Sequence, residues 1–101
     1  MTTLARAMDL VGRKWTLHVV EDLLDGPRRF THIERSLQGT NPKLLTARLR
    51  ELEAAGLVTR TAYAEVPPRV EYALTKRGQE LRPVIAALRR FGSHGRRRRS
   101  T

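Results

Sequence analysis

The chain has 101 residues, of which 40% are hydrophobic, and its 20 Lys and Arg against 10 Asp and Glu give a net charge of +10. This length suits one small domain and leaves little room for a second. The absence of cysteine excludes disulfides, thiolate metal sites and a cysteine redox switch. Sixteen of the basic and all of the acidic residues precede Gly92, so the charge is not only a property of the end of the chain. A polyanionic partner is favoured, and nucleic acid more than a membrane because no long apolar span is present.

The first two predicted helices are amphipathic. No signal peptide is visible in residues 1–6, so we expect a soluble cytoplasmic protein, associated with the nucleoid if it binds DNA. The spacing of Leu4, Met8 and Val11 predicts a short helix over residues 4–11, and apolar residues at helical spacing predict a second over 14–24. Trp15 lies on the apolar stripe of the second helix, which indicates core or dimer-contact packing rather than a ligand site.

Residues 25–27 end the second helix, and the next segment predicts a helix-turn-helix. Thr31 and Glu34 fit a capping box that starts a helix running to about Leu37. A short turn over 38–40, which includes a glycine, then leads into another helix. Asn41 is expected to cap this next helix, with Pro42 at its first position and Gly56 in the left-handed conformation that ends it.

The helix that follows Asn41 has two distinct faces. Leu45, Leu49 and Leu52 form an apolar stripe that we expect to be buried. The opposite face carries cations, a hydroxyl and a small residue, as a major-groove helix requires. The expected base-contacting residues are Lys43, Thr46, Ala47 and Arg50. Taken alone, the pattern favours an ordinary solvated amphipathic helix, and it is the helix-turn-helix context that favours DNA binding.

Two β-prone runs, residues 57–63 and 69–75, come after the helix that follows Asn41, which we call the recognition helix. They are joined by a stiffened loop over 64–68. A hairpin in this position is the wing of a winged-helix domain. We expect Arg60, Pro68 and Arg69 to serve the wing, near the flanking minor groove or the backbone. The residues expected to meet phosphate are Arg28, Arg29, Thr31, Asn41 and Arg48.

A final helix over residues 76–91 is predicted, capped by Thr75 and kinked near Pro83. One short domain cannot bury the apolar stripes of both terminal helices, which indicates a dimer. The expected dimer-interface residues are Leu4, Met8, Val11, Trp15, Leu81, Ile85, Leu88 and Phe91. We divide the chain into a domain over 1–92 and a disordered basic tail over 93–101.

Taken together, these segments resemble the HxlR-type winged helix-turn-helix transcription regulators of bacteria and archaea, which are related to the MarR class. The resemblance lies in residues 9–15 (DLVGRKW), 25–30 (DGPRRF), 41–58 (NPKLLTARLRELEAAGLV) and 66–75 (VPPRVEYALT). It implies a homodimer joined through its terminal helices that binds an inverted repeat in double-stranded DNA. Many members have a Cys-Pro pair where this chain has Thr2 and Thr3, so thiol sensing does not carry over. The family's Gly-Gly is Gly12-Arg13 here, and its usual tryptophan in the last helix is Phe91.

The fold class expected is α+β and mostly α, with about five helices and a two-stranded wing. The expected function is sequence-specific transcription regulation by a homodimer. The alternative is a nucleoid-type or protein-interaction module that does not read sequence. No enzyme motif is present, and we expect neither cofactor nor metal, because His18 has no ligand-like partner at i+4. An unknown small-molecule effector could bind between the long helices near Trp15 and His18.

Overall fold

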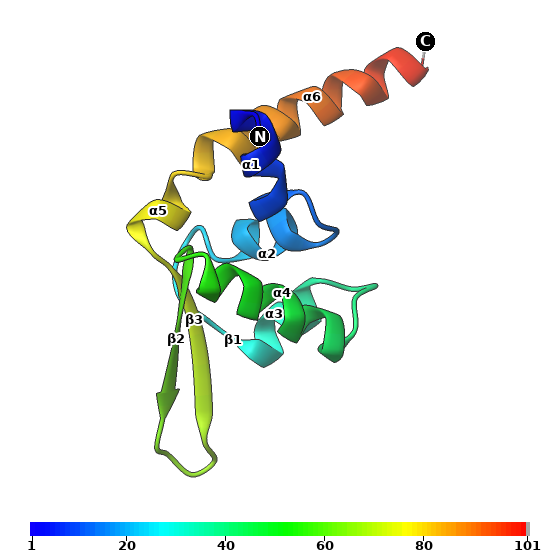
Figure 1. The fold of residues 1–101 in the computed structure, drawn as a ribbon. Helices are drawn as coiled ribbons and strands as arrows, with labels where there is room; N and C mark the ends of the chain where they lie inside the picture. The colour runs from blue at the N-terminus through cyan, green and yellow to red at the C-terminus, as the bar shows by residue number, and fades with distance from the viewer. Residues whose placement is uncertain (101) are drawn as a thin grey trace.

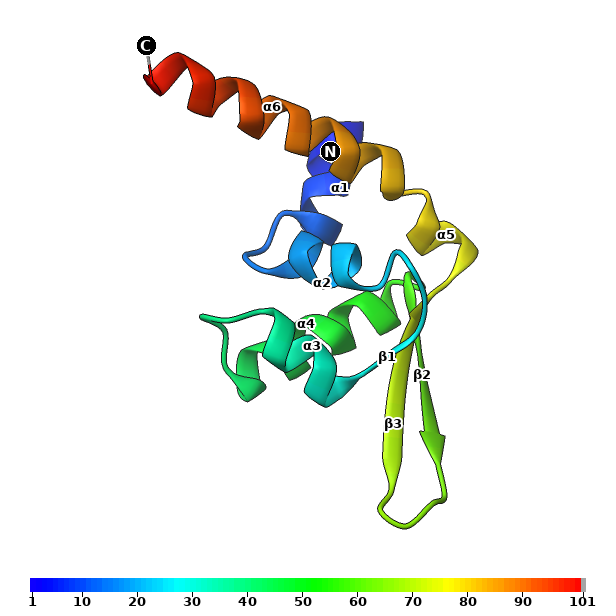
Figure 2. The same ribbon diagram turned by 180° about the vertical axis from the view of Figure 1, so that it is seen from behind.

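The computed structural model describes the backbone of residues 1–100 and the side chains of residues 1–94. Its elements, in chain order, are α1 (Thr3–Val11), α2 (Thr16–Asp22), β1 (Arg28–Arg29), α3 (Phe30–Ser36), α4 (Pro42–Ala54), β2 (Val58–Tyr63), β3 (Arg69–Leu74), α5 (Lys76–Gln79) and α6 (Arg82–Ser100). The helices α1 and α6 lie at one end of the molecule, and the tip of the β2–β3 hairpin lies at the other (Figures 1 and 2). The arrangement is a winged helix-turn-helix, as the sequence predicts.

The core lies between α2, α3, α4 and the base of the hairpin (Figure 1). These elements meet through aliphatic side chains at helical or alternating spacing, which is why each presents one apolar face. The buried apolar residues are Val19, Val20, Leu23, Ile33, Leu37, Leu45, Leu49, Leu52, Leu57, Val58, Tyr72 and Ile85.

The sheet has three antiparallel strands in the order β1-β3-β2, one more than predicted. Across the hairpin, Arg60 is opposite Tyr72, and on the other side of β3, Tyr72 is opposite Arg28. Two residues are too few to show alternation, so β1 left no periodic signal in the sequence.

The ends of α4 are as predicted. The side-chain oxygen of Asn41 accepts a hydrogen bond of 2.8 Å from the backbone N–H of Leu44, and Pro42 is the first helical residue. Gly56 has φ +77°, the left-handed conformation that ends the helix. These signals are local, which explains why the sequence alone located both ends.

The base of the wing is tied to the start of α5. The hydroxyl of Thr75 donates to the carbonyl of Gly56 over 2.7 Å and accepts from the N–H of Gly78 over 3.0 Å. Gly78 packs so closely that a β-carbon there would overlap the carbonyl oxygen of Leu57. Thr75 therefore caps α5, as predicted, and also joins the end of α4 to the end of the hairpin.

The second helix is shorter than the predicted range of 14–24. Trp15 is the N-cap of α2 and has φ +78°, an uncommon conformation for a bulky side chain. Its ring lies 5.0 Å from that of His18, centroid to centroid, and next to Gly39. Tertiary contacts around the turn before α2 thus outweigh the helical pattern at residues 14 and 15.

The predicted capping box at Thr31 is wrong. α3 begins at Phe30, its N-cap is Arg29, and no side chain caps it. Arg29 is also the last residue of β1, where it pairs with Glu71. The strand therefore leads directly into the helix, and strand pairing determines where the helix starts.

The predicted single helix with a kink is two helices. α5 ends at Gln79, and Pro83 lies in the first turn of α6, where its missing N–H costs no hydrogen bond. α6 continues to Ser100, beyond the predicted end at Phe91, because a glycine such as Gly92 costs only about 1 kcal/mol in a helix. The division into a domain and a basic tail stays a prediction, since the side chains of residues 95–101 lie outside the described part.

Candidate nucleic-acid interface

The orientation of α4 is fixed by its buried stripe. Leu45, Leu49 and Leu52 are each 1% exposed and pack in the core. Because successive residues are 100° apart around a helix, the side opposite this stripe must face outward. The predicted base-contacting residues lie on that outward side.

The outward face of α4 forms one continuous surface. Lys43 and Arg50 are exposed, whereas Thr46 and Ala47 are partly buried. Together with Pro42 they line a shallow hollow of about 460 Å³. Among the side chains of residues 1–94, neither cation has an ion-pair partner. Two free cations beside a small residue can approach a polyanion and donate to base edges.

Arg48 lies on the border of the buried face of α4, and its side chain is only 14% exposed. Its Nε donates to the carbonyl of Lys14 over 2.9 Å, and its Nη1 is 3.1 Å from a carboxylate oxygen of Glu51. Glu51 also pairs with Arg13 at 3.1 Å. The i,i+3 spacing of Arg48 and Glu51 was a signal for this pair that the sequence analysis left unused. The guanidinium group is committed to contacts within the protein.

The predicted wing residues differ in whether their side chains are free to contact DNA. Arg69 stacks over the ring of Tyr63 at 4.1 Å and pairs with Glu65 at 3.1 Å and with Glu71 at 3.4 Å. Two carboxylates thus offset the charge of this arginine. Arg60 and Pro68 are exposed on the hairpin and its loop.

A second group of predicted residues lies where β1 meets α3. Arg28, Arg29 and Thr31 are all exposed. The pairing of Arg28 with Tyr72 and of Arg29 with Glu71 holds the two arginines at the base of the wing. The structure thus brings residues 28–31 next to the hairpin. Asn41 caps α4 with its side-chain oxygen, and its amide nitrogen has no hydrogen-bond partner among the described residues.

The predicted dimer-interface residues differ in their exposure and fall into three groups. Leu4 is 71%, Met8 51%, Leu88 49% and Phe91 77% exposed, so α1 and α6 carry large apolar side chains on the surface. Ile85 is 5% exposed and belongs to the core of the single chain. The remaining three, Val11, Trp15 and Leu81, pack partly against that core.

Helix α6 contacts both α2 and the segment that follows it. Arg82 donates to the carbonyl of Leu24, and Arg89 pairs with Glu21. Between the two helices lies a hollow of about 280 Å³ that includes His18 but not Trp15.

Two features of other protein classes are absent from the described residues. No helix there has an apolar stretch long enough to cross a lipid bilayer. No group of three His, Cys, Asp or Glu side chains is placed there to hold a metal ion.

The chain is similar to proteins of a known family. The family model described as HxlR-like helix-turn-helix matches residues 10–100. An HTH-type transcriptional regulator of Synechocystis is 45% identical over 86 residues, which are 85% of this chain and 64% of that protein. The chain therefore spans less than two thirds of the length of this relative.

Solved structures agree with the sequence comparison. The HTH-type transcriptional regulator YtcD is 33% identical, with a TM-score of 0.89 over 94% of this chain and 97% of that one. The redox regulator HypR in its reduced form is 36% identical, with a TM-score of 0.88 over 94% of each chain. Because this chain has no cysteine, any thiol chemistry of a redox regulator has no counterpart here.

Proposed function

The chain belongs to the HxlR-like helix-turn-helix family, whose named relatives are transcriptional regulators, and we propose that it is a homodimer that binds an inverted-repeat operator in double-stranded DNA. The observation that carries this proposal is the outward face of α4, where Lys43 and Arg50 are free of ion pairs within the described side chains. We propose that these two residues, with Thr46 and Ala47, meet base edges in the major groove.

Phosphate contacts would position this helix without reading sequence. We assign them to Arg28, Arg29 and Thr31 where β1 meets α3, to the amide of Asn41, and to Arg60 on the hairpin. Pro68 would shape the wing loop, since proline has no N–H to donate. Arg69 would act there as a partly neutralised cation. Arg48, with its contacts to Lys14 and Glu51, would hold α4 in place rather than bind phosphate.

The exposed apolar residues of α1 and α6 support dimer formation through these two helices. A surface of large apolar side chains on a monomer is a sign of an interface. Leu4, Met8, Leu88 and Phe91 would be buried against a second copy, with Val11, Trp15 and Leu81 at the edge. A two-fold dimer matches an operator whose half-sites are about one helical turn apart or a small multiple of it. Such a protein would work on chromosomal DNA in the cytoplasm.

The test is binding to DNA from the protein's own upstream region, compared with scrambled DNA of equal length across a salt series. A preference of about a thousandfold or more, with two chains bound per site, is the expected result. Equal affinity for scrambled DNA and for fragments selected from the whole genome would contradict sequence-specific binding.

The alternative is a nucleoid-type or protein-interaction module, which the run of four arginines over residues 96–99 favours. Deletion of residues 93–101 separates the two functions. A sequence-specific DNA-binding protein keeps its preference for the operator after this deletion, whereas a non-specific one loses most of its DNA affinity.

A further inference from the structure

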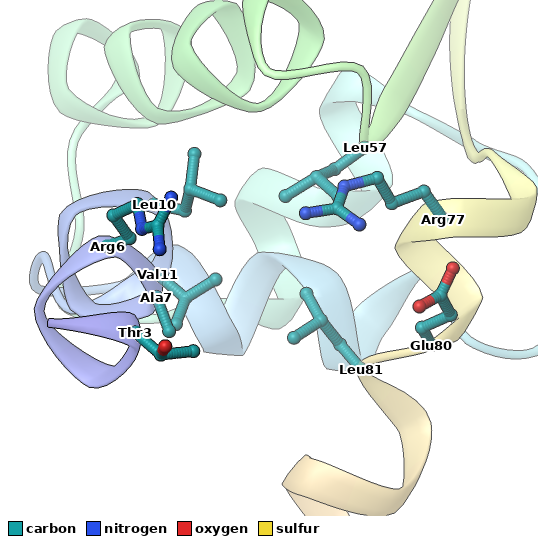
Figure 3. Close-up of a pocket in the computed structure, with 9 residues that line it drawn as sticks. All are labelled: Thr3, Arg6, Ala7, Leu10, Val11, Leu57, Arg77, Glu80 and Leu81. Carbon is teal, nitrogen blue, oxygen red and sulfur yellow. The ribbon is translucent and has the colours of Figure 1, made fainter.

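A cavity of about 460 Å³ lies between α1, α5 and the segment that joins α4 to β2 (Figure 3). Leu10 and Val11 from α1, Leu57 from the joining segment and Leu81 beyond α5 form its apolar walls. This volume is within the range of about 300–1,000 Å³ that is usual for small-molecule sites, which are mostly apolar with a few polar groups.

The polar groups of the cavity are mainly cationic. Arg6 of α1 and Arg77 of α5 extend toward the space between these helices from opposite sides (Figure 3). Within the described side chains, neither guanidinium has a carboxylate within ion-pair distance. Glu80 also lines the cavity, so two positive charges face one negative charge. The balance favours an anion.

We propose that this cavity binds a small amphipathic organic anion, that is, an aryl or acyl group carrying one acidic group. The apolar part would lie against Leu10, Val11, Leu57 and Leu81. The acidic group would accept charge-assisted hydrogen bonds from Arg6 and Arg77, whose planar guanidinium groups match the geometry of a carboxylate or sulfonate. Glu80 would disfavour ligands with two negative charges.

The position of the cavity connects it to the DNA-binding elements. Leu57 follows Gly56, the residue that ends α4, and its carbonyl accepts a hydrogen bond of 3.0 Å from Thr75 at the end of the hairpin. α1, on the other side of the cavity, belongs to the apolar surface assigned to the dimer. A ligand that prefers one arrangement of these elements changes the DNA affinity by its differential affinity for the two arrangements. This last step rests on the proposed function, whereas ligand binding itself does not.

The binding test uses the full chain and 8-anilinonaphthalene-1-sulfonate, a fluorescent probe with an aromatic body and one sulfonate. Its neutral analogue, N-phenyl-1-naphthylamine, lacks the sulfonate. The double variant Arg6→Gln/Arg77→Gln should bind the sulfonate at least fivefold more weakly and the neutral analogue within twofold of the unmodified chain. Ala7→Phe places a ring in the cavity from an exposed position of α1 and should abolish binding of both probes.

Matched controls carry the same changes at exposed positions away from the cavity. Arg35→Gln in α3 and Ala64→Phe in the wing loop, at the opposite end of the molecule from α1 (Figure 1), should leave both probe affinities within twofold. Circular dichroism and sedimentation accompany each variant. Unchanged probe binding in Ala7→Phe, or equal weakening of the two probes in the double arginine variant, would overturn the proposal. Conversion of a dimer to a monomer by Ala7→Phe would also overturn it, since the cavity would then be a contact with a second copy.

The link to DNA is measured separately, as operator affinity with and without a saturating concentration of the sulfonate probe. A change of about fivefold or more is expected for a coupled site. Intact probe binding in a protein without operator preference would refute the proposed function and leave the cavity proposal standing. Intact operator binding without probe binding would refute the cavity proposal and leave the proposed function standing.

Discussion

The Nε of Arg48, in the recognition helix, donates a hydrogen bond of 2.9 Å to the carbonyl of Lys14, in the turn before α2. The same guanidinium shares the carboxylate of Glu51 with Arg13. Two arginines and one glutamate thus connect α4 to the segment that follows α1. The most basic part of α4 therefore contains one arginine that supports the fold and one, Arg50, that is free to meet DNA.

Arg48→Ala should lower the free energy of unfolding by about 1–3 kcal/mol, because it removes charged hydrogen bonds at a nearly buried position. Urea denaturation measures this loss. Arg50→Ala, at an exposed position of the same helix, is the control and should stay within about 0.5 kcal/mol of the unmodified chain. Equal stability of the two variants would remove the supporting role of Arg48.

Arg50→Ala should weaken operator binding by about 1–3 kcal/mol and relax discrimination at one base pair, because a base contact is lost. Titration of the operator and of single-base-pair variants measures both effects. The affinity for random DNA should change much less. Equal losses on operator and random DNA would assign Arg50 to phosphate instead.

Arg69→Ala should weaken binding to all DNA sequences alike and reduce the magnitude of the salt slope by up to about 1, as expected for a phosphate contact. Glu65→Gln should act in the opposite direction, because it removes one of the two carboxylates that pair with Arg69. Both are measured as log affinity against log salt. Tighter binding by Arg69→Ala would show that its role is confined to the ion pairs of the wing.

Gly78→Ala should destabilise the fold by about 1–3 kcal/mol, because the added methyl group would overlap the backbone carbonyl of Leu57. Gly92→Ala is the matched control: nothing lies within 4 Å of its added methyl group, and alanine favours a helix by about 1 kcal/mol relative to glycine. The melting temperature and the free energy of unfolding in urea should therefore fall for Gly78→Ala and rise for Gly92→Ala. A neutral Gly78→Ala would show that α5 can shift away from the base of the wing.

Leu88→Glu and Phe91→Glu should each shift a dimer toward the monomer, because a charge would be buried in the proposed interface. Sedimentation equilibrium measures the dissociation constant, which should rise at least tenfold. Val66→Glu, at a fully exposed position in the wing loop, is the control and should leave it unchanged. Dimers that tolerate both substitutions would exclude this part of α6 from the interface.

The sequence predicts best those features that depend on neighbouring residues. Asn41, Pro42 and Gly56 determine the ends of α4 by local capping, and the structure has them as expected. The buried stripe of α4 and the two strands of the wing follow from periodicity in the same way.

The features that the sequence did not predict depend on contacts between distant segments. The left-handed conformation of Trp15 accompanies contacts with the α3–α4 turn, and the start of α3 follows from pairing between β1 and β3. The hydrogen bond of Arg48 to the carbonyl of Lys14 joins segments 34 residues apart and left no signal in the sequence. The carboxylate partners of Arg48 and Arg69 are near in sequence, and their spacing could have indicated these pairs. A basic residue on a predicted DNA-binding helix is thus only a candidate until its partners are known.

The attachment of α6 to α2 has a consequence for the spacing of the operator. Ile85 of α6 is buried in the core and Arg82 donates to the carbonyl of Leu24, so the helix proposed to join two copies is anchored to the same body that carries α4. In a dimer built this way, the fold sets the distance between the two α4 helices. We expect it to accept a single distance between half-sites. Five added base pairs place one half-site on the opposite side of the double helix and should abolish specific binding. Ten added base pairs bring the two half-sites back to the same side but separate them by more than the distance between the two α4 helices, so specific binding should stay lost.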